Sequence, residues 1–177
     1  PLAALEGKVA ASSLLTGASA ELYRHDVYSS GPAPLAVLRP ASVEELARGI
    51  GAATAAGIAI VPRGGGMSYT GGYVAPEAGA LIVDMGRMQR ILEINETDMT
   101  VTVEAGCTWA ALYEALHPKG LRTPAWGTLS GLYANVGGGM SQNGLFWGGR
   151  DGTIAPSVIC AEVVLADGSV MKTGSDF

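Results

Sequence analysis

The segment 61–72 concentrates groups that could bind an anion. It contains Gly64-Gly65-Gly66 and Gly71-Gly72, hydroxyl donors at Ser68 and Thr70, and a cation at Arg63. Glycine adopts positive φ without strain and lets a ligand approach the main chain closely. Consecutive backbone N–H groups in such a turn form a concave nest for anionic oxygens, and a diphosphate fits this set of donors best. A glycine-rich turn without a ligand is the alternative, because short glycine motifs are weakly specific.

A strand, a helix and a second strand are predicted directly before this loop. The apolar runs 36–39 and 58–61 have the composition of buried strands. Between them, Ser42 and Glu45 are spaced as a capping box at the start of a helix that Gly57 can end. A βαβ unit of this kind makes its two strands parallel. Because ligands bind at the carboxyl edge of such sheets, the position of the loop favours a phosphate-binding role.

The other segments predict an α+β chain of two α/β lobes. We expect helical structure in residues 2–16, a strand at 81–85, a hairpin of 91–95 with 100–104 that buries one face, a helix over 108–117, and a buried strand at 158–165 that turns at 166–169 into 170–173. A small parallel βαβ lobe therefore comes first, and a mostly antiparallel lobe follows.

Residues 121–152 form a second glycine-rich region without clear hydrophobic periodicity. It includes Thr123-Pro124-Ala125-Trp126-Gly127-Thr128, Asn135-Val136-Gly137-Gly138-Gly139-Met140-Ser141-Gln142-Asn143-Gly144 and Trp147-Gly148-Gly149-Arg150. A connection of about thirty residues is too long to be idle in a compact domain, so we expect it to have a function.

Composition and charge exclude several classes of function. The chain has 177 residues, enough for one sizeable core or two small lobes. Its net charge of −5 argues against nucleic-acid binding, which needs a basic patch. No stretch reaches the roughly 18 uninterrupted apolar residues of a membrane span. We identify no signal peptide at the N-terminus and therefore expect a cytoplasmic protein.

Other catalytic and nucleotide-binding motifs fit less well. The loop lacks the Gly-Lys-Ser/Thr ending of P-loop nucleotidases, and no acidic residue follows about 20 positions after a Gly-x-Gly-x-x-Gly helix start. No His/Cys/Asp/Glu cluster has metal-ligand spacing, and no Ser/His/Asp set is convincing. Cys107 and Cys160 lie in apolar surroundings, which favours buried free thiols over a disulfide.

Five short segments of the sequence, taken together, indicate a known protein family. They are Pro62–Ser68, Leu81–Met85, Val103–Gly106, Asn135–Gly139 and Glu162–Gly168. In this order and spacing they resemble the PCMH-type FAD-binding domain of the vanillyl-alcohol oxidase and p-cresol methylhydroxylase flavoprotein superfamily. The resemblance implies an FAD-binding domain over 31–177, and we expect residues 1–30 to form a helical lead-in before it. The first lobe would span 31–86 and the second 87–177, with FAD extended between them.

The resemblance also implies roles for both glycine regions. The loop would hold the pyrophosphate, residues 124–141 would run beside the pyrophosphate and flavin, and main chain near Val163 would meet the adenine end. The residues expected to bind FAD are Pro62, Arg63, Gly64, Gly65, Gly66, Met67, Ser68, Tyr69, Pro124, Gly127, Thr128, Asn135, Val136, Gly137, Gly138, Ser141, Gln142 and Val163. Arg63 or Arg150 could stabilise the reduced flavin or the diphosphate, with a surface position in a loop as the alternative. Trp126, Trp147 and Tyr69 could line the isoalloxazine or adenine, with ordinary packing as the alternative.

Three departures from the family's pattern change these expectations. Met67 stands where some members attach the flavin through a histidine, so we expect non-covalent FAD at this position. Cys160 stands where many members have glycine, which could shift a flavin contact. Members normally continue with a segment that closes the FAD site and with a substrate domain, which we do not find in this sequence. The catalytic residues are therefore not predicted.

These observations favour the FAD-binding part of a flavin-dependent oxidoreductase. In that hypothesis an alcohol or hydroxy-acid substrate delivers a hydride to the flavin, and a second acceptor takes the electrons. A non-catalytic FAD- or nucleotide-binding subunit, which leaves the chemistry to a partner chain, is the alternative from another class. An α/β scaffold without a ligand is the third. Self-association into a homo-oligomer stays open.

Overall fold

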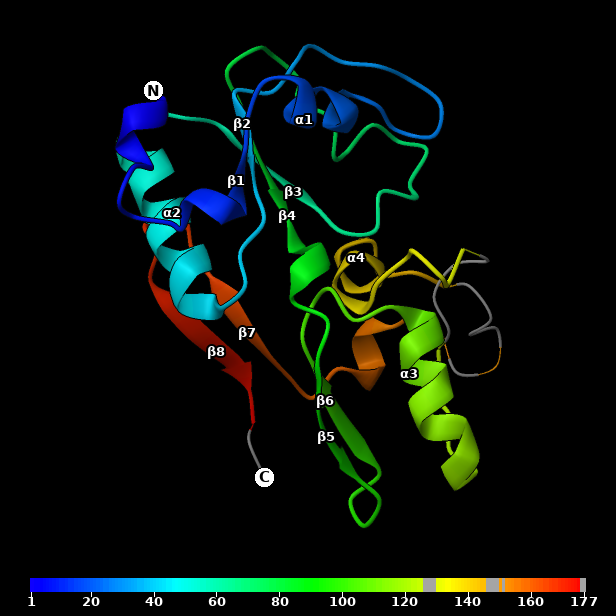
Figure 1. Cartoon of the computed structure of the whole chain (residues 1–177). Coiled ribbons are helices and arrows are strands. Elements are labelled where there is room, and N and C mark those ends of the chain that lie inside the picture. Colours follow the sequence, from blue (N-terminus) through cyan, green and yellow to red (C-terminus); the bar gives the residue numbers. More distant parts are fainter. Residues whose placement is uncertain (126–129, 146–149, 151, 176–177) are drawn as a thin grey trace. The chain divides into compact units, whose positions relative to one another are not determined.

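The computed structural model describes residues 1–125, 130–145, 150 and 152–175 (Figure 1). Its elements belong to two compact units. The first contains Pro1–Arg87 with Cys160–Phe177, and the second contains Met88–Ile159. A partly parallel sheet, antiparallel hairpins and helices confirm the predicted α+β class. Within the described ranges, no helix has the length and apolar character needed to cross a bilayer.

The first unit is built on a four-stranded sheet in the order β1-β2-β4-β3. Its strands are β1 (Leu14–Leu15), β2 (Ala36–Leu38), β3 (Ile60–Arg63) and β4 (Leu81–Asp84). β2 and β3 both run parallel to β4, so their predicted common direction is confirmed. They are not neighbours, however, because β4 lies between them. Every residue of β2 and β4 is buried, which explains why these two runs are almost wholly apolar.

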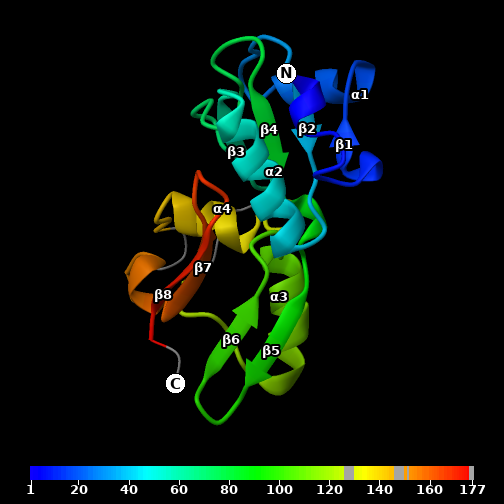
Figure 2. The same ribbon diagram turned by 90° about the vertical axis from the view of Figure 1, so that its left-hand side faces the viewer.

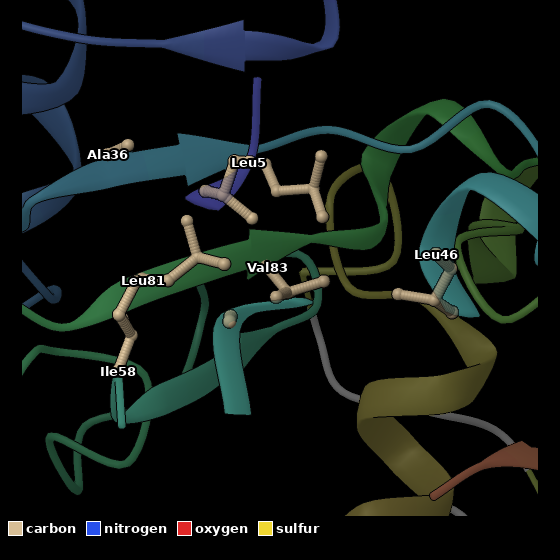
Figure 3. Packing of buried hydrophobic residues seen from close by; sticks show 8 residues of the cluster. Leu5, Ala36, Leu46, Ile58, Leu81 and Val83 are labelled. Carbon is tan, nitrogen blue, oxygen red and sulfur yellow. The ribbon is translucent and has the colours of Figure 1, made fainter. Parts of the chain in front are cut away.

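The core of the first unit lies between this sheet and the helix α2 (Val43–Ala55) (Figure 3). Its buried members are Leu5, Ala36, Leu38, Leu46, Ala53, Ile58, Leu81 and Val83. Burying a leucine or valine side chain contributes about 1.5–3 kcal/mol before the entropy of ordering is subtracted. This cluster therefore holds the strands whose carboxyl ends carry the glycine loop.

The start of α2 uses its predicted cap in a modified form. The Ser42 hydroxyl accepts the backbone N–H of Glu45 at 3.2 Å, as a capping residue should. The Glu45 carboxylate instead accepts the backbone N–H groups of Ala41 at 2.8 Å and Ala10 at 2.9 Å. Burial raises the pKa of Glu45, but these hydrogen bonds outweigh it and hold the pKa below its usual value. Glu45 thereby fixes the N-terminal segment to the helix.

The helical expectation for residues 2–16 is wrong. The chain forms short 3-10 turns, η1 (Leu2–Ala4) and η2 (Ala11–Ser13), and then enters β1, which pairs antiparallel with β2. The short helices α1 (Ala18–Glu21) and η3 (Leu22–Arg24) follow. Leu5 is completely buried in the core. Pairing with the sheet edge and burial of Leu5 override a weak helical pattern, because tertiary contacts outweigh local propensity.

The C-terminal hairpin consists of β7 (Cys160–Val164) and β8 (Val170–Gly174) and groups with the first unit, whereas the sequence analysis placed it in the second lobe. Its turn lies against α2 (Figure 2). A Cβ on Gly168 would lie 2.6 Å from the Ala47 carbonyl oxygen, and Gly168 has φ +83°. The expected burial of β7 is wrong, because most of its residues are exposed, Cys160 among them.

The second unit contains the hairpin of β5 (Ile91–Asn95) and β6 (Thr100–Val103), whose antiparallel pairing confirms the prediction. None of the residues in these two strands is fully buried, so the expected buried face is only half-covered. The helix α3 (Trp109–Leu116) buries Trp109, Leu112 and Leu116 and passes through η5 (His117–Lys119) to Gly120 at φ +70°. The helix α4 (Val136–Ser141) and the turn η6 (Ala155–Ser157) complete the unit.

Candidate functional site

The glycine loop leaves the sheet at the carboxyl end of β3. Arg63, the last residue of this strand, is the register partner of Asp84 at the carboxyl end of the parallel strand β4. The chain then crosses residues 64–80 without entering a helix or strand. The loop therefore lies at the sheet edge where the sequence placed it, and the partly exposed main chain of residues 64–68 is open to a ligand.

The backbone N–H groups of residues 64–68 are available donors. Within the described part of the chain, none of them donates a hydrogen bond to another protein group. The Ser68 and Thr70 hydroxyls form a hydrogen bond with each other at 2.9 Å, so one of the two keeps its O–H hydrogen for a ligand in the same turn. An anion such as a diphosphate would satisfy these groups, which is the chemistry that the sequence predicts for this loop.

Arg63 packs beneath the loop between two tyrosines. Its guanidinium carbon lies 4.4 Å from the ring centroid of Tyr73 and 5.1 Å from that of Tyr23. One guanidinium N–H group donates to the His25 carbonyl oxygen at 3.3 Å. A Cβ on Gly66 would lie only 2.5 Å from the guanidinium, and Gly66 has φ +68°. Close packing and backbone conformation together require glycine at this position.

Tyr73 supports the loop from inside the protein. Its side chain is buried, and its hydroxyl lies 2.6 Å from the Gly66 carbonyl oxygen and 3.1 Å from that of Ser68. Burial raises the pKa of Tyr73 above its usual value, while the positive charge of Arg63 lowers it less strongly. The hydroxyl is therefore protonated at neutral pH and donates to the loop.

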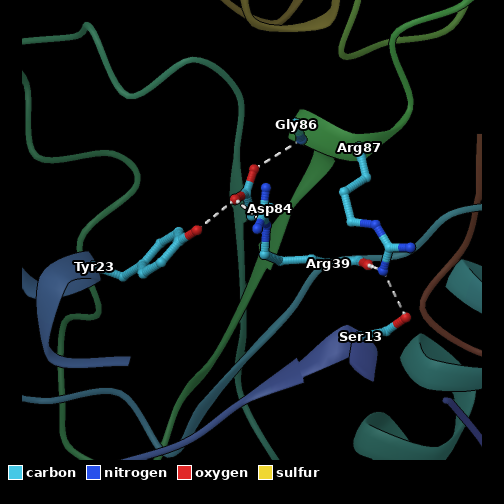
Figure 4. A network of polar contacts seen from close by, with 6 residues as sticks. All are labelled: Ser13, Tyr23, Arg39, Asp84, Gly86 and Arg87. Atoms are coloured by element: carbon cyan, nitrogen blue, oxygen red, sulfur yellow. Dashed lines mark hydrogen bonds and ion pairs between the residues drawn. The ribbon is translucent and has the colours of Figure 1, made fainter. Parts of the chain in front are cut away.

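Asp84, the register partner of Arg63, organises a second set of polar contacts (Figure 4). Its carboxylate accepts the Tyr23 hydroxyl at 2.7 Å, the Arg39 Nε–H at 3.1 Å and the Gly86 backbone N–H at 2.8 Å. Burial, together with the hydrogen bond to Asp84, raises the pKa of Tyr23 to about 12. These contacts position the Tyr23 ring against which the Arg63 guanidinium lies.

The same network reaches the N-terminal segment through η4 (Met85–Arg87). The Arg87 guanidinium donates to the Ser13 hydroxyl at 3.0 Å and to the Arg39 carbonyl oxygen at 3.1 Å (Figure 4). Because Arg39 also contacts Asp84, the ends of β2 and β4 are fixed together. The carboxyl ends of β2 and β4, the latter paired with β3, are therefore held by polar contacts as well as by the core.

In the second unit, the glycine run 137–139 forms the helix α4, which the sequence analysis did not predict. Asn135 caps it, with its buried side-chain oxygen accepting the Gly138 N–H at 2.9 Å. A Cβ on Gly137 would lie 2.8 Å from Ala105, and one on Gly139 would lie 2.9 Å from the Trp109 ring. Gly137 and Gly139 let α4 lie close to Ala105 and Trp109. Close packing therefore explains glycine at these two positions without a ligand.

The remaining predicted residues lie in both units. Pro62, Met67, Tyr69 and Val163 belong to the first unit, and Pro124, Val136, Ser141 and Gln142 belong to the second. Tyr69 is 69% exposed, and Val163 lies on the exposed strand β7. The Ser141 hydroxyl is used inside α4, where it donates to the Gly137 carbonyl oxygen at 2.9 Å. Gly127, Thr128, Trp126 and Trp147 lie outside the described residues.

Sequence reasoning missed Tyr73, Tyr23 and Asp84. The only available signals were the tyrosine that directly follows Gly71-Gly72 and the acidic residue that ends an apolar strand. No group of at least three His, Cys, Asp and Glu side chains in the described ranges is placed to hold a metal ion.

Comparison with known proteins agrees with this geometry. The chain matches the FAD binding domain family over residues 34–174. It is 34% identical over 142 residues to the glycolate oxidase subunit GlcD of Bacillus subtilis, covering 80% of this chain and 30% of that protein. It is 36% identical over 112 residues to the D-2-hydroxyglutarate dehydrogenase of Xanthomonas citri pv. viticola, covering 63% of this chain and 23% of that protein.

Solved structures share the fold at lower sequence identity. An alkyldihydroxyacetonephosphate synthase superposes with a TM-score of 0.85 at 20% identity, over 97% of this chain and 34% of that one. A p-cresol methylhydroxylase with bound substrate superposes with a TM-score of 0.81 at 20% identity, over 98% of this chain and 34% of that one. The predicted PCMH-type fold is thus confirmed. The family match covers most of the sequence, and this chain therefore belongs to the FAD-binding domain family.

Proposed function

We propose that this chain is the FAD-binding part of a flavin-dependent oxidoreductase that acts on an alcohol or hydroxy acid. The available N–H groups of residues 64–68 are the observation that carries the proposal. The names of similar proteins support the substrate class: a glycolate oxidase subunit, a D-2-hydroxyglutarate dehydrogenase and a D-lactate dehydrogenase. The chain spans only about a third or less of these relatives, so the activity of the whole protein is part of the proposal.

The loop would hold FAD through its diphosphate. The backbone N–H groups of residues 64–68 and the hydroxyls of Ser68 and Thr70 would bind the diphosphate oxygens, with Arg63 as a fixed positive charge below them. Met67 lacks the imidazole nitrogen through which some members of the family attach the flavin, so FAD at this position would be held non-covalently. When bound, FAD supplies the ring that accepts the hydride, and the protein supplies position and electrostatics.

The first test is a visible absorption spectrum of the chain after FAD is added and free FAD is removed. Flavin bands near ~450 nm that stay with the protein, and are released into the supernatant on acid denaturation, would support non-covalent binding. Flavin that stays with the precipitated protein would contradict the non-covalent assignment. A chain that retains no flavin, also when prepared at the full length of its relatives, would contradict the proposal.

A non-catalytic subunit that needs a partner chain is the second candidate. It is favoured by the limited share of the relatives that this chain covers and by a relative that is itself named as a subunit. Anaerobic addition of glycolate, D-lactate or D-2-hydroxyglutarate to the FAD-loaded chain tests this second candidate. We expect no bleaching of the flavin with this chain alone. Bleaching by one of these acids would show that the chain itself contains the substrate-binding groups, and would contradict this expectation.

Two other sequence-based expectations stay predictions: a cytoplasmic location and self-association into a homo-oligomer.

A further inference from the structure

The Tyr73 hydroxyl contacts two carbonyl oxygens of the glycine loop, at 2.6 Å from Gly66 and 3.1 Å from Ser68. Tyr73 is buried, so it reaches the loop from the protein side, opposite the solvent. We propose that Tyr73 is a positioning residue that sets the anion-binding shape of this loop before FAD binds. The inference rests on the proposed function of the loop and assigns a role to a residue outside the predicted binding set.

The geometry of the peptide bond explains how a carbonyl contact can position an N–H group. In a trans peptide the C=O and the following N–H are held in one plane and point in opposite directions. When the Gly66 carbonyl oxygen faces Tyr73, the N–H of Met67 must face away from it. The same holds for the Ser68 carbonyl oxygen and the N–H of Tyr69. One buried hydroxyl thereby directs two backbone donors away from the protein interior.

Arg63 holds Tyr73 in the orientation that this role requires. The guanidinium lies 4.4 Å from the Tyr73 ring centroid and is supported on another side by Tyr23 at 5.1 Å. Such cation–π contacts fix the ring as well as the cation. Gly66 adds a constraint, since its φ of +68° and its closeness to the guanidinium leave no space for a side chain. Tyr73 and Arg63 therefore both pack against the side of the loop that faces the protein interior.

Removing the Tyr73 hydroxyl should have different effects on FAD affinity if Tyr73 only stabilises the core and if it positions the loop. Loss of a purely structural hydroxyl lowers stability but leaves the FAD affinity of the remaining folded protein unchanged. Loss of a positioning hydroxyl lowers the affinity, because the loop must be ordered when FAD binds. The experiment therefore needs a binding readout, a readout of loop order without FAD, and a variant that loses a tyrosine hydroxyl elsewhere.

The test variant is Tyr73→Phe, which keeps the ring against Arg63 and removes only the donor. Tyr113→Phe is the first control, because Tyr113 lies on α3 in the second unit and not in the glycine loop or among the residues that support it. Tyr28→Phe is the second, since its side chain is 88% exposed. FAD affinity is measured by titration of flavin fluorescence at a temperature where all variants are folded. Backbone order parameters of Met67 and Tyr69 are measured by NMR without FAD.

We expect Tyr73→Phe to weaken FAD binding about five- to tenfold, the effect of losing one buried hydrogen bond. The controls should stay within about twofold of the original chain. The order parameters of Met67 and Tyr69 should fall in Tyr73→Phe alone. Unchanged affinity and unchanged loop order in Tyr73→Phe would overturn the inference. If the original chain binds no FAD, the proposed function fails, and the order parameters alone decide whether Tyr73 shapes the loop.

Discussion

Arg63 and Asp84 are register partners at the carboxyl ends of β3 and β4, yet their charged side chains contact different groups. The Asp84 carboxylate is paired with Arg39 at 3.1 Å. Arg63 forms no salt bridge within the described ranges and lies instead against the ring of Tyr73. The glycine loop therefore starts beside a positive charge that no carboxylate neutralises, which favours an anionic ligand.

Gly65→Asp should weaken FAD binding by about tenfold or more, because the new carboxylate repels a diphosphate held by the neighbouring N–H groups. The affinity is measured by flavin fluorescence titration. Gly7→Asp is the charge control, because it adds the same charge to the first unit at a glycine with open space around it. Since Gly7 has φ +69°, this variant loses some stability, and both affinities are measured at a temperature where both variants are folded. If Gly65→Asp binds FAD as tightly as the control, the diphosphate does not lie in this loop.

Gly66→Ala should lower both stability and FAD affinity. A non-glycine residue at positive φ costs about 1–2 kcal/mol, and the new methyl group must also displace the Arg63 guanidinium. Gly57→Ala isolates the second effect, because Gly57 has a similar φ of +70° with nothing within 4 Å. We expect Gly66→Ala to lose more free energy of unfolding in urea than Gly57→Ala. Equal losses, with unchanged FAD affinity in both, would contradict the described packing of Arg63.

Glu104→Gln should change how stability depends on pH. The hydrogen bonds and ion pair from Arg90, at 2.7 Å, outweigh burial and hold the pKa of the Glu104 carboxyl below its usual value. A lowered folded-state pKa contributes stability above the unfolded-state pKa, and this contribution is lost as pH falls through the folded-state value. The free energy of unfolding of the original chain should thus exceed that of Glu104→Gln at neutral pH.

The difference in free energy of unfolding between the original chain and Glu104→Gln should become smaller below about pH 4.3, the pKa of an unperturbed glutamate. Urea unfolding followed by tryptophan fluorescence at a series of pH values measures it. Glu114→Gln is the control, because Glu114 is exposed on α3. If this difference in free energy of unfolding stays constant down to pH 3, the ion pair between Arg90 and Glu104 does not form.

The two cysteines should differ in reactivity. Cys160 is exposed, while Cys107 is fully buried, and burial together with nearby Glu104 raises the pKa of the Cys107 thiol. Because the thiolate is the reactive form, alkylation of native protein should modify Cys160 at least about tenfold faster. Mass spectrometry of peptides after a short iodoacetamide pulse reads both sites, and Cys160→Ser should remove the fast phase. Equal rates at both cysteines would contradict the exposed placement of β7.

Features that depend on neighbouring residues could be predicted from the amino-acid sequence. The cap at Ser42, the apolar runs of β2 and β4, the β5–β6 hairpin and the position of the loop after β3 all follow from local composition and spacing. These patterns are readable because a cap or a tight turn involves only a few consecutive residues, and a buried strand needs only a short apolar run. The family resemblance was available for the same reason, since its segments are short and ordered.

Contacts between residues far apart in the sequence became visible only in the folded structure. Tyr73 under Gly66, Tyr23 against Arg63 and Asp84 beside Arg39 are pairings that no local pattern specifies. Local sequence also does not specify that β1 pairs with β2 at the sheet edge, where the residue pattern suggested a helix. Nor does it specify that the glycines of α4 pack against Ala105 and Trp109. Long-range packing selects these contacts through shape and hydrogen-bond satisfaction, and both exist only once the chain has folded.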